Sequence, residues 1–334
     1  MAEPRKKTAS SGPDEALPKK RVHVRRRAGK VALVGRPNVG KSTFLNSLLG
    51  ERLAITSPHP QTTRDRIAGI LTVGATQYVF LDTPGIHVAK NKLGVRMNQV
   101  AEEATREADV VVLMTDLGEE PRPELRPEDR AILEGLPPGV PTLLVLNKVD
   151  RVKDKTALFP VLEALAKAWP FAALLPVSAR KKEGPERILA ELEQLMPEGD
   201  FLYPEDELSD KPVRFFVAEY VREQILTHTR QEVPHGVAVL VETFEEGLRV
   251  PRIQLVVHVD KESHKAIVLG EKGRLMKEIG TRARARVEEL LGRQVHLAIH
   301  VRATPRWYES DARLEEMGYG ASRPTSGGRA GKQS

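Results

Sequence analysis

Short apolar runs alternate with stretches of helical periodicity over the first part of the chain. A helical pattern at Thr43–Leu49 follows the first run, and another at Pro185–Leu195 follows the last. Runs this short fit strands buried inside a parallel sheet, and their alternation with helices is typical of an α/β fold. The predicted strands are Lys30–Val34, Gln77–Leu81, Pro141–Leu146 and Ala172–Val177.

The pattern changes beyond Met196–Glu207, an acidic stretch that contains proline and glycine. One helical pattern precedes two strand-like runs, a glycine-containing segment leads into a second helix, and a last strand follows. This order predicts a smaller α+β domain. Its expected elements are Arg214–Arg230, Gly236–Phe244, Arg252–Val259, Ala266–Gly273, Arg274–Leu291 and His296–Val301.

The length of 334 residues suggests two domains with tails. Aromatic residues make up only 4% of the chain, so we expect aliphatic cores. The predicted divisions are a disordered basic arm at 1–27, a nucleotide-binding domain at 28–198, a linker at 199–210, a second domain at 211–320 and a disordered tail at 321–334.

The net charge of the chain indicates the kind of partner that it binds. The net charge of +6 favours a polyanion, and basic residues are dense at the end of the arm, in Lys19–Arg27. The arm either contacts RNA phosphates without specificity or is a solvated leader. The chain has no cysteine, which excludes disulfides and zinc-thiolate sites and is compatible with the cytosol. No apolar run is long enough to predict a transmembrane segment.

A phosphate loop, Gly35-Arg-Pro-Asn-Val-Gly-Lys-Ser42, lies between the first predicted strand and the first helix. In that setting, the backbone N–H groups and the helix N-terminus bind phosphate oxygens. The Lys41 ammonium reaches the β- and γ-phosphates, and the Ser42 hydroxyl ligates Mg²⁺. The loop therefore predicts a nucleotide site made by Gly35, Asn38, Val39, Gly40, Lys41, Ser42 and Thr43.

The segment Asn147-Lys-Val-Asp150 follows a predicted strand and selects the base. Open α/β sheets bind ligands at the carboxyl ends of their strands. The Asp150 carboxylate can accept hydrogen bonds from the N1–H and the amine of guanine, whereas adenine has no N1–H. Asn147 would bond the other edge of the purine, and the Lys148 stem would cover one face. Ser178 and Ala179 fit the loop whose N–H meets guanine O6.

Two further segments predict a magnesium site that responds to the γ-phosphate. Asp82 ends a predicted strand and would hold Mg²⁺ through a water, while the Gly85 N–H would touch the γ-phosphate. A threonine hydroxyl from the preceding loop would complete the metal shell, and we favour Thr63 over Thr62.

Ile86 stands where Ras-like switches carry a glutamine that orients the attacking water. Isoleucine can neither donate nor accept a hydrogen bond, so we expect slow intrinsic hydrolysis. Backbone groups, waters, a partner or a potassium ion near Asn38 would then supply the missing function. We assign the catalytic roles to Lys41, Thr63 and Gly85.

The second domain contains Gly270-Glu-Lys-Gly273 between an apolar segment and a helix. A lone G-x-x-G is a weak signal, but this order of elements is that of a KH domain, whose glycines let a nucleic-acid backbone approach closely. The carboxylate of Glu271 is unfavourable toward phosphate, so Lys272 and backbone N–H groups should make that contact. The predicted RNA-binding residues are Gly270, Glu271, Lys272, Gly273, Lys277, Arg282 and Arg284.

These elements resemble the Era family of TRAFAC-class GTPases, which joins a G domain to a type II KH domain. The resemblance rests on Pro60–Arg64, Asp82–His87 and the second half of the chain, and it extends from about Lys30 to Tyr319. It implies an α/β P-loop GTPase domain followed by a smaller α+β KH domain. The basic arm is a departure, because Era proteins usually start close to the first strand.

The resemblance implies a monomeric ribosome-assembly factor of the cytoplasm that uses GTP, GDP and Mg²⁺. Its KH domain would bind the 3′ end of 16S rRNA and assist maturation of the small (30S) subunit, with some peripheral contact at the inner membrane surface. The alternative is a signalling or membrane-surface switch with a KH-like protein-binding domain. Because the arm has no amphipathic apolar face, stable insertion into a membrane is disfavoured.

Overall fold

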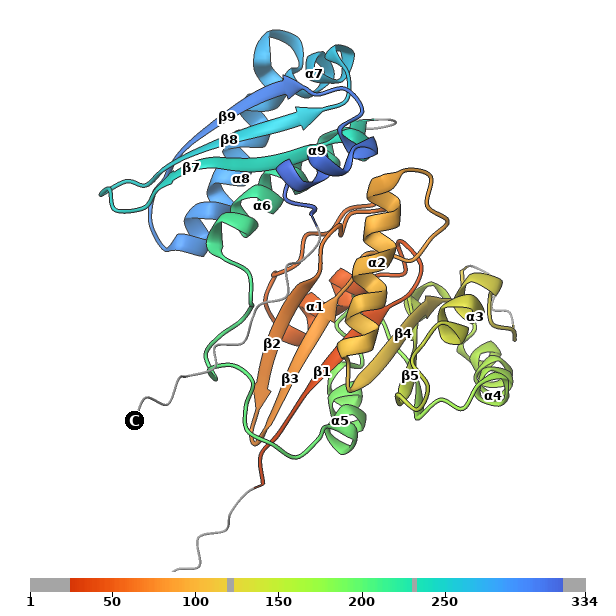
Figure 1. The fold of residues 1–334 in the computed structure, drawn as a ribbon. Helices are drawn as coiled ribbons and strands as arrows, with labels where there is room; N and C mark the ends of the chain where they lie inside the picture. Colours follow the sequence, from red (N-terminus) through yellow and green to blue (C-terminus); the bar gives the residue numbers. More distant parts are fainter. Residues whose placement is uncertain (1–24, 119–122, 230–232, 321–334) are drawn as a thin grey trace, which may run out of the picture.

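Two β-sheets, each with its own helices, form the part of the chain that the computed structural model describes, which is residues 25–118, 123–229 and 233–320. Figure 1 shows the larger, N-terminal sheet below and the smaller, C-terminal sheet above, with α2 alongside the larger sheet and its upper end near α9. The predicted fold class, an α/β P-loop domain followed by a smaller α+β KH domain, is confirmed.

The larger sheet has the strand order β2-β3-β1-β4-β5-β6. All neighbours are parallel except β2, which pairs antiparallel with β3 across a tight turn. The carboxyl ends of the parallel strands therefore meet at one edge. The strands are β1 (Arg27–Val34), β2 (Ile67–Val73), β3 (Thr76–Asp82), β4 (Val110–Asp116), β5 (Thr142–Asn147) and β6 (Ala173–Pro176).

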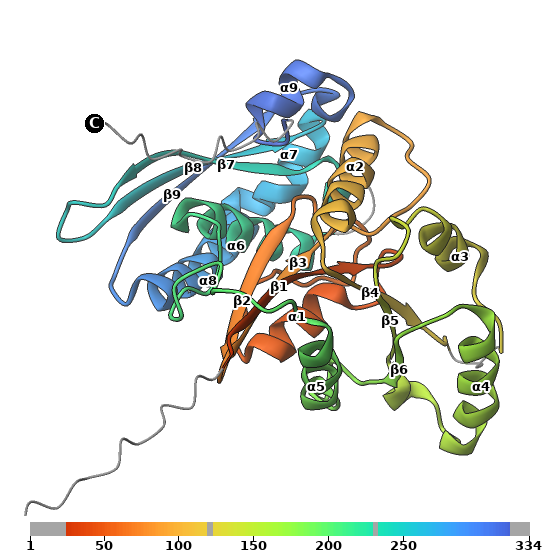
Figure 2. The ribbon, with the colours of Figure 1, turned by 60° about the horizontal axis from the view of Figure 1, so that its bottom comes forward.

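Helices cover both faces of this sheet (Figure 2). One face packs against α1 (Lys41–Leu49) and α5 (Pro185–Leu195). The other face packs against α2 (Lys92–Glu107), α3 (Pro127–Glu134) and α4 (Leu158–Ala168). Most of the buried side chains are aliphatic, as expected, although Phe44 and Phe80 are also buried completely.

The smaller sheet has the order β7-β8-β9, with β7 antiparallel and β9 parallel to β8. Helices α6 and α8 pack together against it around one apolar core. The elements are α6 (Val213–His228), β7 (Ala238–Glu245), β8 (Arg252–Val259), α7 (Glu262–Leu269), α8 (Arg274–Leu291), β9 (His296–Ala303) and α9 (Asp311–Glu316). Short 3₁₀ turns lie at Val149–Arg151, Lys155–Ala157, Val233–Gly236, Glu271–Gly273 and Trp307–Glu309.

The segment predicted as a linker, 199–210, lies along the outer strand of the larger sheet. The Ile70 N–H donates to the Leu208 carbonyl at 3.0 Å, and the Ser209 hydroxyl donates to the Ala68 carbonyl at 2.7 Å. Ser209 also forms an antiparallel bridge with Gly69. The segment thus covers the free edge of β2, which would otherwise expose unpaired backbone groups.

Several elements were not anticipated from the sequence, among them β2, β4 and helices α2, α3, α4 and α9. Strand β1 begins at Arg27, inside the range predicted for the basic arm, and Arg25 forms an ion pair with Glu198 at 3.1 Å. The rest of the predicted arm and the predicted tail at 321–334 lie outside the described residues. None of the described helices is long and apolar enough to cross a membrane.

Candidate nucleotide and nucleic-acid sites

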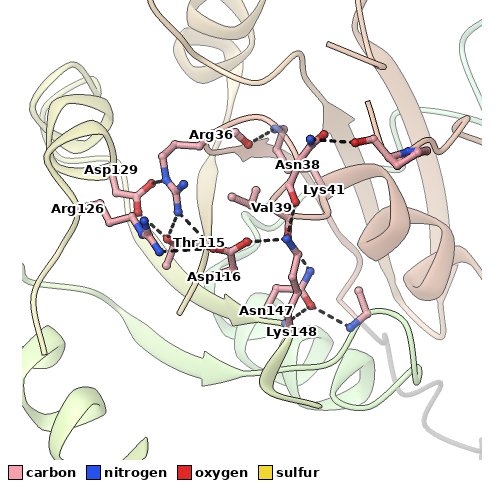
Figure 3. Close-up of polar contacts among 12 residues, drawn as sticks. Arg36, Asn38, Val39, Lys41, Thr115, Asp116, Arg126, Asp129, Asn147 and Lys148 are labelled. Atoms are coloured by element: carbon pink, nitrogen blue, oxygen red, sulfur yellow. Dashed lines mark hydrogen bonds and ion pairs between the residues drawn. The ribbon is translucent and has the colours of Figure 1, made fainter. Parts of the chain in front are cut away.

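The phosphate loop connects β1 to α1 at the carboxyl edge of the sheet. Gly40 has φ 102°, and a Cβ at this position would lie 2.4 Å from Nδ2 of Asn147. Only glycine fits this left-handed and crowded position. The same Asn147 nitrogen donates to the Val39 carbonyl at 2.8 Å (Figure 3). The loop is therefore fastened to the end of β5, the strand that precedes the predicted base-binding segment.

Lys41 is buried beneath the loop. Its Nζ donates to the carbonyls of Gly35 at 3.1 Å and Arg36 at 3.2 Å. Burial lowers the pKa of Lys41 to about 8, although the nearby Asp82 carboxylate opposes this shift. A phosphate anion next to the ammonium would favour the charged form. Lys41 is thus oriented inward, toward the place where the loop would enclose a phosphate.

The predicted magnesium residues Ser42, Thr63 and Asp82 lie together. The Ser42 hydroxyl is 2.8 Å from that of Thr63 and donates to Oδ2 of Asp82 at 2.7 Å. The Oδ1 atom of Asp82 is buried without a hydrogen-bond partner among the described residues. Burial raises the pKa of Asp82 to about 6. A buried carboxylate with an unpaired oxygen and two adjacent hydroxyls is a donor set that suits Mg²⁺.

The two threonine candidates are separated by their contacts. The Thr62 hydroxyl donates to the His59 carbonyl at 2.7 Å and lies 2.6 Å from the Ser57 hydroxyl. It therefore points back into its own loop, whereas Thr63 contacts Ser42. The geometry favours Thr63 as the residue that would complete the metal shell.

The predicted base-binding residues form a second cluster. The Asn147 side-chain oxygen accepts from the N–H groups of Lys148 at 2.8 Å and Ala179 at 3.0 Å, which leaves one amide N–H for a purine. Ser178 donates to Asp150 at 2.7 Å, and this hydrogen bond lowers the pKa of the Asp150 carboxyl. Asp150 is thus ionised and retains acceptor capacity for guanine.

One side chain of this cluster was missed in the sequence analysis. Asp116, at the end of β4, accepts from Nζ of Lys148 at 2.6 Å, and the same Nζ donates to the Asn38 carbonyl at 2.6 Å. Figure 3 shows Lys148 held between the phosphate loop and β4. The available signal in the sequence was an aspartate, Asp116, at the end of an apolar run. That signal points to Lys148 only when β4 and β5 are known to be neighbours.

Arg36 extends this network on the outside of the phosphate loop. Its Nε donates to Asp129 at 3.0 Å, and its Nη2 donates to Thr115 at 3.2 Å (Figure 3). Thr115 in turn donates to Asp129 at 2.5 Å. These contacts connect the loop to α3 and β4 and restrain its backbone before any ligand binds.

The segment after Asp82 lies against the phosphate loop. The Ile86 N–H donates to the Gly35 carbonyl at 3.2 Å, and the Ile86 side chain packs into an apolar cluster. Ile86 therefore does not provide a polar group for a water. His87 joins the two loops around the site, because its Nδ1 lies 2.8 Å from the Gly85 carbonyl and its Nε2 lies 2.8 Å from Nε2 of Gln61.

In the second domain, Gly270–Gly273 connects α7 to α8. Gly270 has φ 71°, and a Cβ there would lie 2.6 Å from Cβ of Leu275. Glu271 and Lys272 are exposed at the tip. Gly270 is thus required by its packing against Leu275, whereas a Cβ at Gly273 would meet no atom within 4 Å, so the backbone at Gly273 is open to the approach of a nucleic-acid strand.

The basic residues of α8 do not all share one face. Lys277 and Arg284 are seven residues apart and lie on the same side, whereas Arg282 is turned well away from them. Arg282 pairs with Glu278 at 2.8 Å, and Arg284 lies 3.9 Å from Glu288. Lys277 and Arg284 therefore share one side of α8 and Arg282 lies on another, and the RNA contacts of all three stay a prediction.

Two family descriptions match the chain. Residues 30–148 match the family described as "50S ribosome-binding GTPase", and residues 232–307 match the family described as "KH domain". These ranges contain the phosphate loop and the Gly270–Gly273 loop.

Curated relatives match over most of their length. The GTPase Era of Geotalea uraniireducens is 44% identical over 295 residues, which cover 88% of this chain and 98% of the relative. The GTPase Era of Syntrophus aciditrophicus is 40% identical over 296 residues, which cover 88% of this chain and 95% of the relative.

Two solved structures are similar throughout. One is the crystal structure of Era in complex with MgGDPNP and nucleotides 1506-1542 of 16S ribosomal RNA, with a TM-score of 0.85 and 37% identity, covering 89% of this chain and 100% of that one. The other is the crystal structure of a single-residue variant of Aquifex aeolicus Era bound to GDP.AlF4-, with a TM-score of 0.84 and 37% identity, covering 88% of this chain and 100% of that one.

Proposed function

Because the chain belongs to the Era family of GTPases, we propose that it is a GTP-hydrolysing switch that binds the 3′ end of 16S rRNA and assists assembly of the small ribosomal subunit. One observation carries this proposal. The phosphate loop, the base-binding segment and the Gly270–Gly273 loop occur in one chain that matches the complete length of an Era chain solved with both a GTP analogue and 16S RNA.

The base and phosphates of GTP are bound at the edge of the larger sheet. Asp150 accepts from the guanine N1–H and amine, and Asn147 donates to the purine. Lys41 and the loop N–H groups neutralise charge that develops on the phosphates during cleavage. Mg²⁺, held by Ser42, Thr63 and a water on Asp82, neutralises further phosphate charge when bound.

Hydrolysis is slow because the residue at the water-orienting position, Ile86, is apolar. The groups nearest the expected γ-phosphate are the backbone of Gly85 and the hydroxyl of Thr63. An additional cation near Asn38 is an alternative, because the Asn38 amide nitrogen donates to the Pro58 carbonyl at 3.2 Å and the amide oxygen remains for an ion. A slow rate suits a timer that reports the nucleotide state to a bound RNA.

RNA binding takes place in the second domain. A single strand passes over Gly270–Gly273, with Lys272, Lys277 and Arg284 neutralising its phosphates. Base contacts in the adjoining groove give sequence preference, because phosphate contacts carry affinity without specificity. Because ribosomal subunits are assembled in the cytoplasm, a 16S rRNA partner places the protein there. The protein is expected to act as a monomer.

The experiment is a binding titration of the full chain with GTP analogue, GDP or no nucleotide. The ligands are a short oligonucleotide of the 16S 3′ end, a scrambled oligonucleotide of equal composition, and anionic vesicles. Preferential binding of the 3′-end sequence supports the proposal. Equal binding of both oligonucleotides, or vesicle binding alone, contradicts it and favours the membrane-surface alternative.

A further inference from the structure

The loop between α1 and β2, residues 55–64, carries Thr63 and is fixed by the second domain at several points. At its start, the Thr56 N–H donates to the Glu223 carboxylate at 2.9 Å. Glu223 belongs to α6, is almost completely buried, and also accepts from Nη2 of Arg52 at 2.7 Å. Ile55 packs into the apolar core of the second domain. The beginning of the loop is therefore part of the domain interface.

The neighbour of Glu223 holds the other end of the loop. Arg222, only 1% exposed, donates through Nη2 to the Thr62 carbonyl at 2.5 Å. Its guanidinium is oriented by Glu219, which accepts from Nε at 2.7 Å and from Nη2 at 2.5 Å. Because one carboxylate holds the Nε–Nη2 edge at two points, the Nη2 group that donates to Thr62 is held rigidly. Because the peptide bond is planar, fixing the Thr62 carbonyl also fixes the N–H of Thr63.

The residue after Thr63 is anchored as well. Arg64 is 3% exposed and donates to the backbone carbonyls of Pro234 at 3.0 Å and His235 at 3.1 Å, and also to that of Val237. Both neighbours of Thr63 thus bond to the second domain, while the Thr63 hydroxyl bonds to Ser42 in the first. A shift of α6 must therefore either move the Thr63 hydroxyl or break the bond between Arg222 and the Thr62 carbonyl.

We propose that Arg222, from the RNA-binding domain, is a positioning residue for GTP hydrolysis. It holds Thr63 where its hydroxyl completes the Mg²⁺ shell, so the catalytic site is assembled only when the second domain is docked on the loop. This inference rests on the proposed function, because it assumes Mg²⁺-dependent GTP hydrolysis. Since coupling between binding sites is reciprocal, bound Mg²⁺ and GTP must in turn stabilise the docked arrangement.

The test compares full-length parent, Arg222→Ala, Arg222→Lys and a control, Asp311→Ala. The control removes a different interdomain ion pair, between Asp311 and Lys92, and does not touch the loop. Single-turnover hydrolysis is measured as a function of Mg²⁺ concentration. Affinity for GDP in EDTA is measured alongside, because it depends on the base site and phosphate loop but not on Thr63.

Arg222→Ala should raise the Mg²⁺ concentration for half-maximal rate about tenfold or more, since misplacement by about 1 Å can lower rates by larger factors. Affinity for GDP in EDTA should stay within about twofold of the parent. The Mg²⁺ concentration for half-maximal rate in Arg222→Lys should be intermediate, because an ammonium keeps the positive charge but lacks the planar fork that holds Glu219 at two points and aims a third N–H at the Thr62 carbonyl. Asp311→Ala should have the Mg²⁺ dependence and the GDP affinity of the parent.

A parental Mg²⁺ dependence in Arg222→Ala would overturn the inference and leave the proposed function intact. If Arg222→Ala does not fold, Arg222→Lys and Glu219→Gln decide, since both keep a donor near Thr62 but loosen its orientation. Parental curves for both would equally refute the positioning role. Absence of Mg²⁺-dependent hydrolysis in the parent would instead contradict the proposed function itself.

Discussion

The side-chain amide of Asn147 donates a hydrogen bond to the backbone carbonyl of Val39 at 2.8 Å. This bond connects the base-binding segment to the phosphate loop, two motifs that are far apart in the sequence. The base and the β-phosphate of one nucleotide must therefore be recognised by a single rigid unit. Substitutions at either motif can be tested by their separate effects on the two ends of the ligand.

The first prediction concerns guanine specificity. Asp150→Asn removes the carboxylate that accepts from guanine N1–H and amine, and the loss of a charge-assisted pair costs roughly 2–4 kcal/mol. Titration of the parent and of Asp150→Asn with GDP, ATP and XTP measures this loss. The variant should bind GDP more weakly than the parent. Ser178→Ala is the matched control, since it removes only one supporting hydrogen bond. An Asp150→Asn protein with parental GDP affinity would show that the base site is elsewhere.

The second prediction concerns hydrolysis. Lys41→Ala should reduce the single-turnover cleavage rate far more than Ile86→Ala, because Lys41 stabilises phosphate charge and Ile86 packs in an apolar cluster. A large loss confined to Ile86→Ala would mean that this side chain organises the reaction. Replacing K⁺ by Na⁺ tests the ion near Asn38, and equal rates in the two salts would exclude it.

The third prediction is a pH dependence of stability without nucleotide or Mg²⁺. Burial raises the pKa of Asp82 from 3.8 to about 6, so the folded protein binds a proton more tightly than the unfolded chain. The free energy of unfolding therefore falls as pH rises through this interval, by at most about 3 kcal/mol from this group. Asp82→Asn should remove this part of the fall in unfolding free energy, because an amide does not ionise.

Thermal unfolding of parent and Asp82→Asn from pH 4 to 8 measures the difference directly. The variant should be more stable at pH 7.5, and the difference should shrink toward pH 4, close to the unfolded pKa of 3.8, where the carboxyl is protonated in the folded protein and about half protonated in the unfolded chain. A difference that grows toward low pH would have the wrong sign and would refute the assignment.

The fourth prediction concerns the RNA-binding loop. Changing Glu271 and Lys272 both to Asp places two carboxylates beside Gly270 and Gly273, where RNA phosphates would pass. Most single-strand binding should be lost. Because both side chains are exposed, GTP affinity and the unfolding temperature should stay near the parent values. If the variant still distinguishes the 16S 3′ end from the scrambled sequence, recognition does not run through this loop.

The fifth prediction concerns the basic arm. Deletion of residues 1–24 leaves Arg25 and β1 in place and should weaken RNA binding without changing sequence preference. The slope of affinity against salt concentration should become shallower, since fewer phosphates are neutralised. Unchanged affinity and slope would indicate that the arm is a solvated leader.

The sequence predicted those parts of the site that lie in contiguous motifs. Gly35–Ser42 and Asn147–Asp150 could be assigned because each motif sets its own chemistry and follows a recognisable strand. Strand β2 was missed because Gly69 and Thr72 interrupt its apolar run. Asp116 and Arg222 were missed for another reason: their roles depend on partners, Lys148 and Thr62, that only the folded chain brings near.

The coverage of β2 by the segment through Ser209 also determines where the two domains can pivot. The Ala68 N–H donates to the Asp210 carboxylate at 3.2 Å, so the covering segment stays bonded to β2 as far as Asp210. Only Lys211 and Pro212 separate it from α6, and Arg222 lies nine helical residues beyond Val213, at about 14 Å. The displacement of Arg222 is therefore set by its distance from the start of α6. A rotation of the helix by about ten degrees at Val213 moves Arg222 by about 2 Å, which is sufficient to break its hydrogen bond to the Thr62 carbonyl.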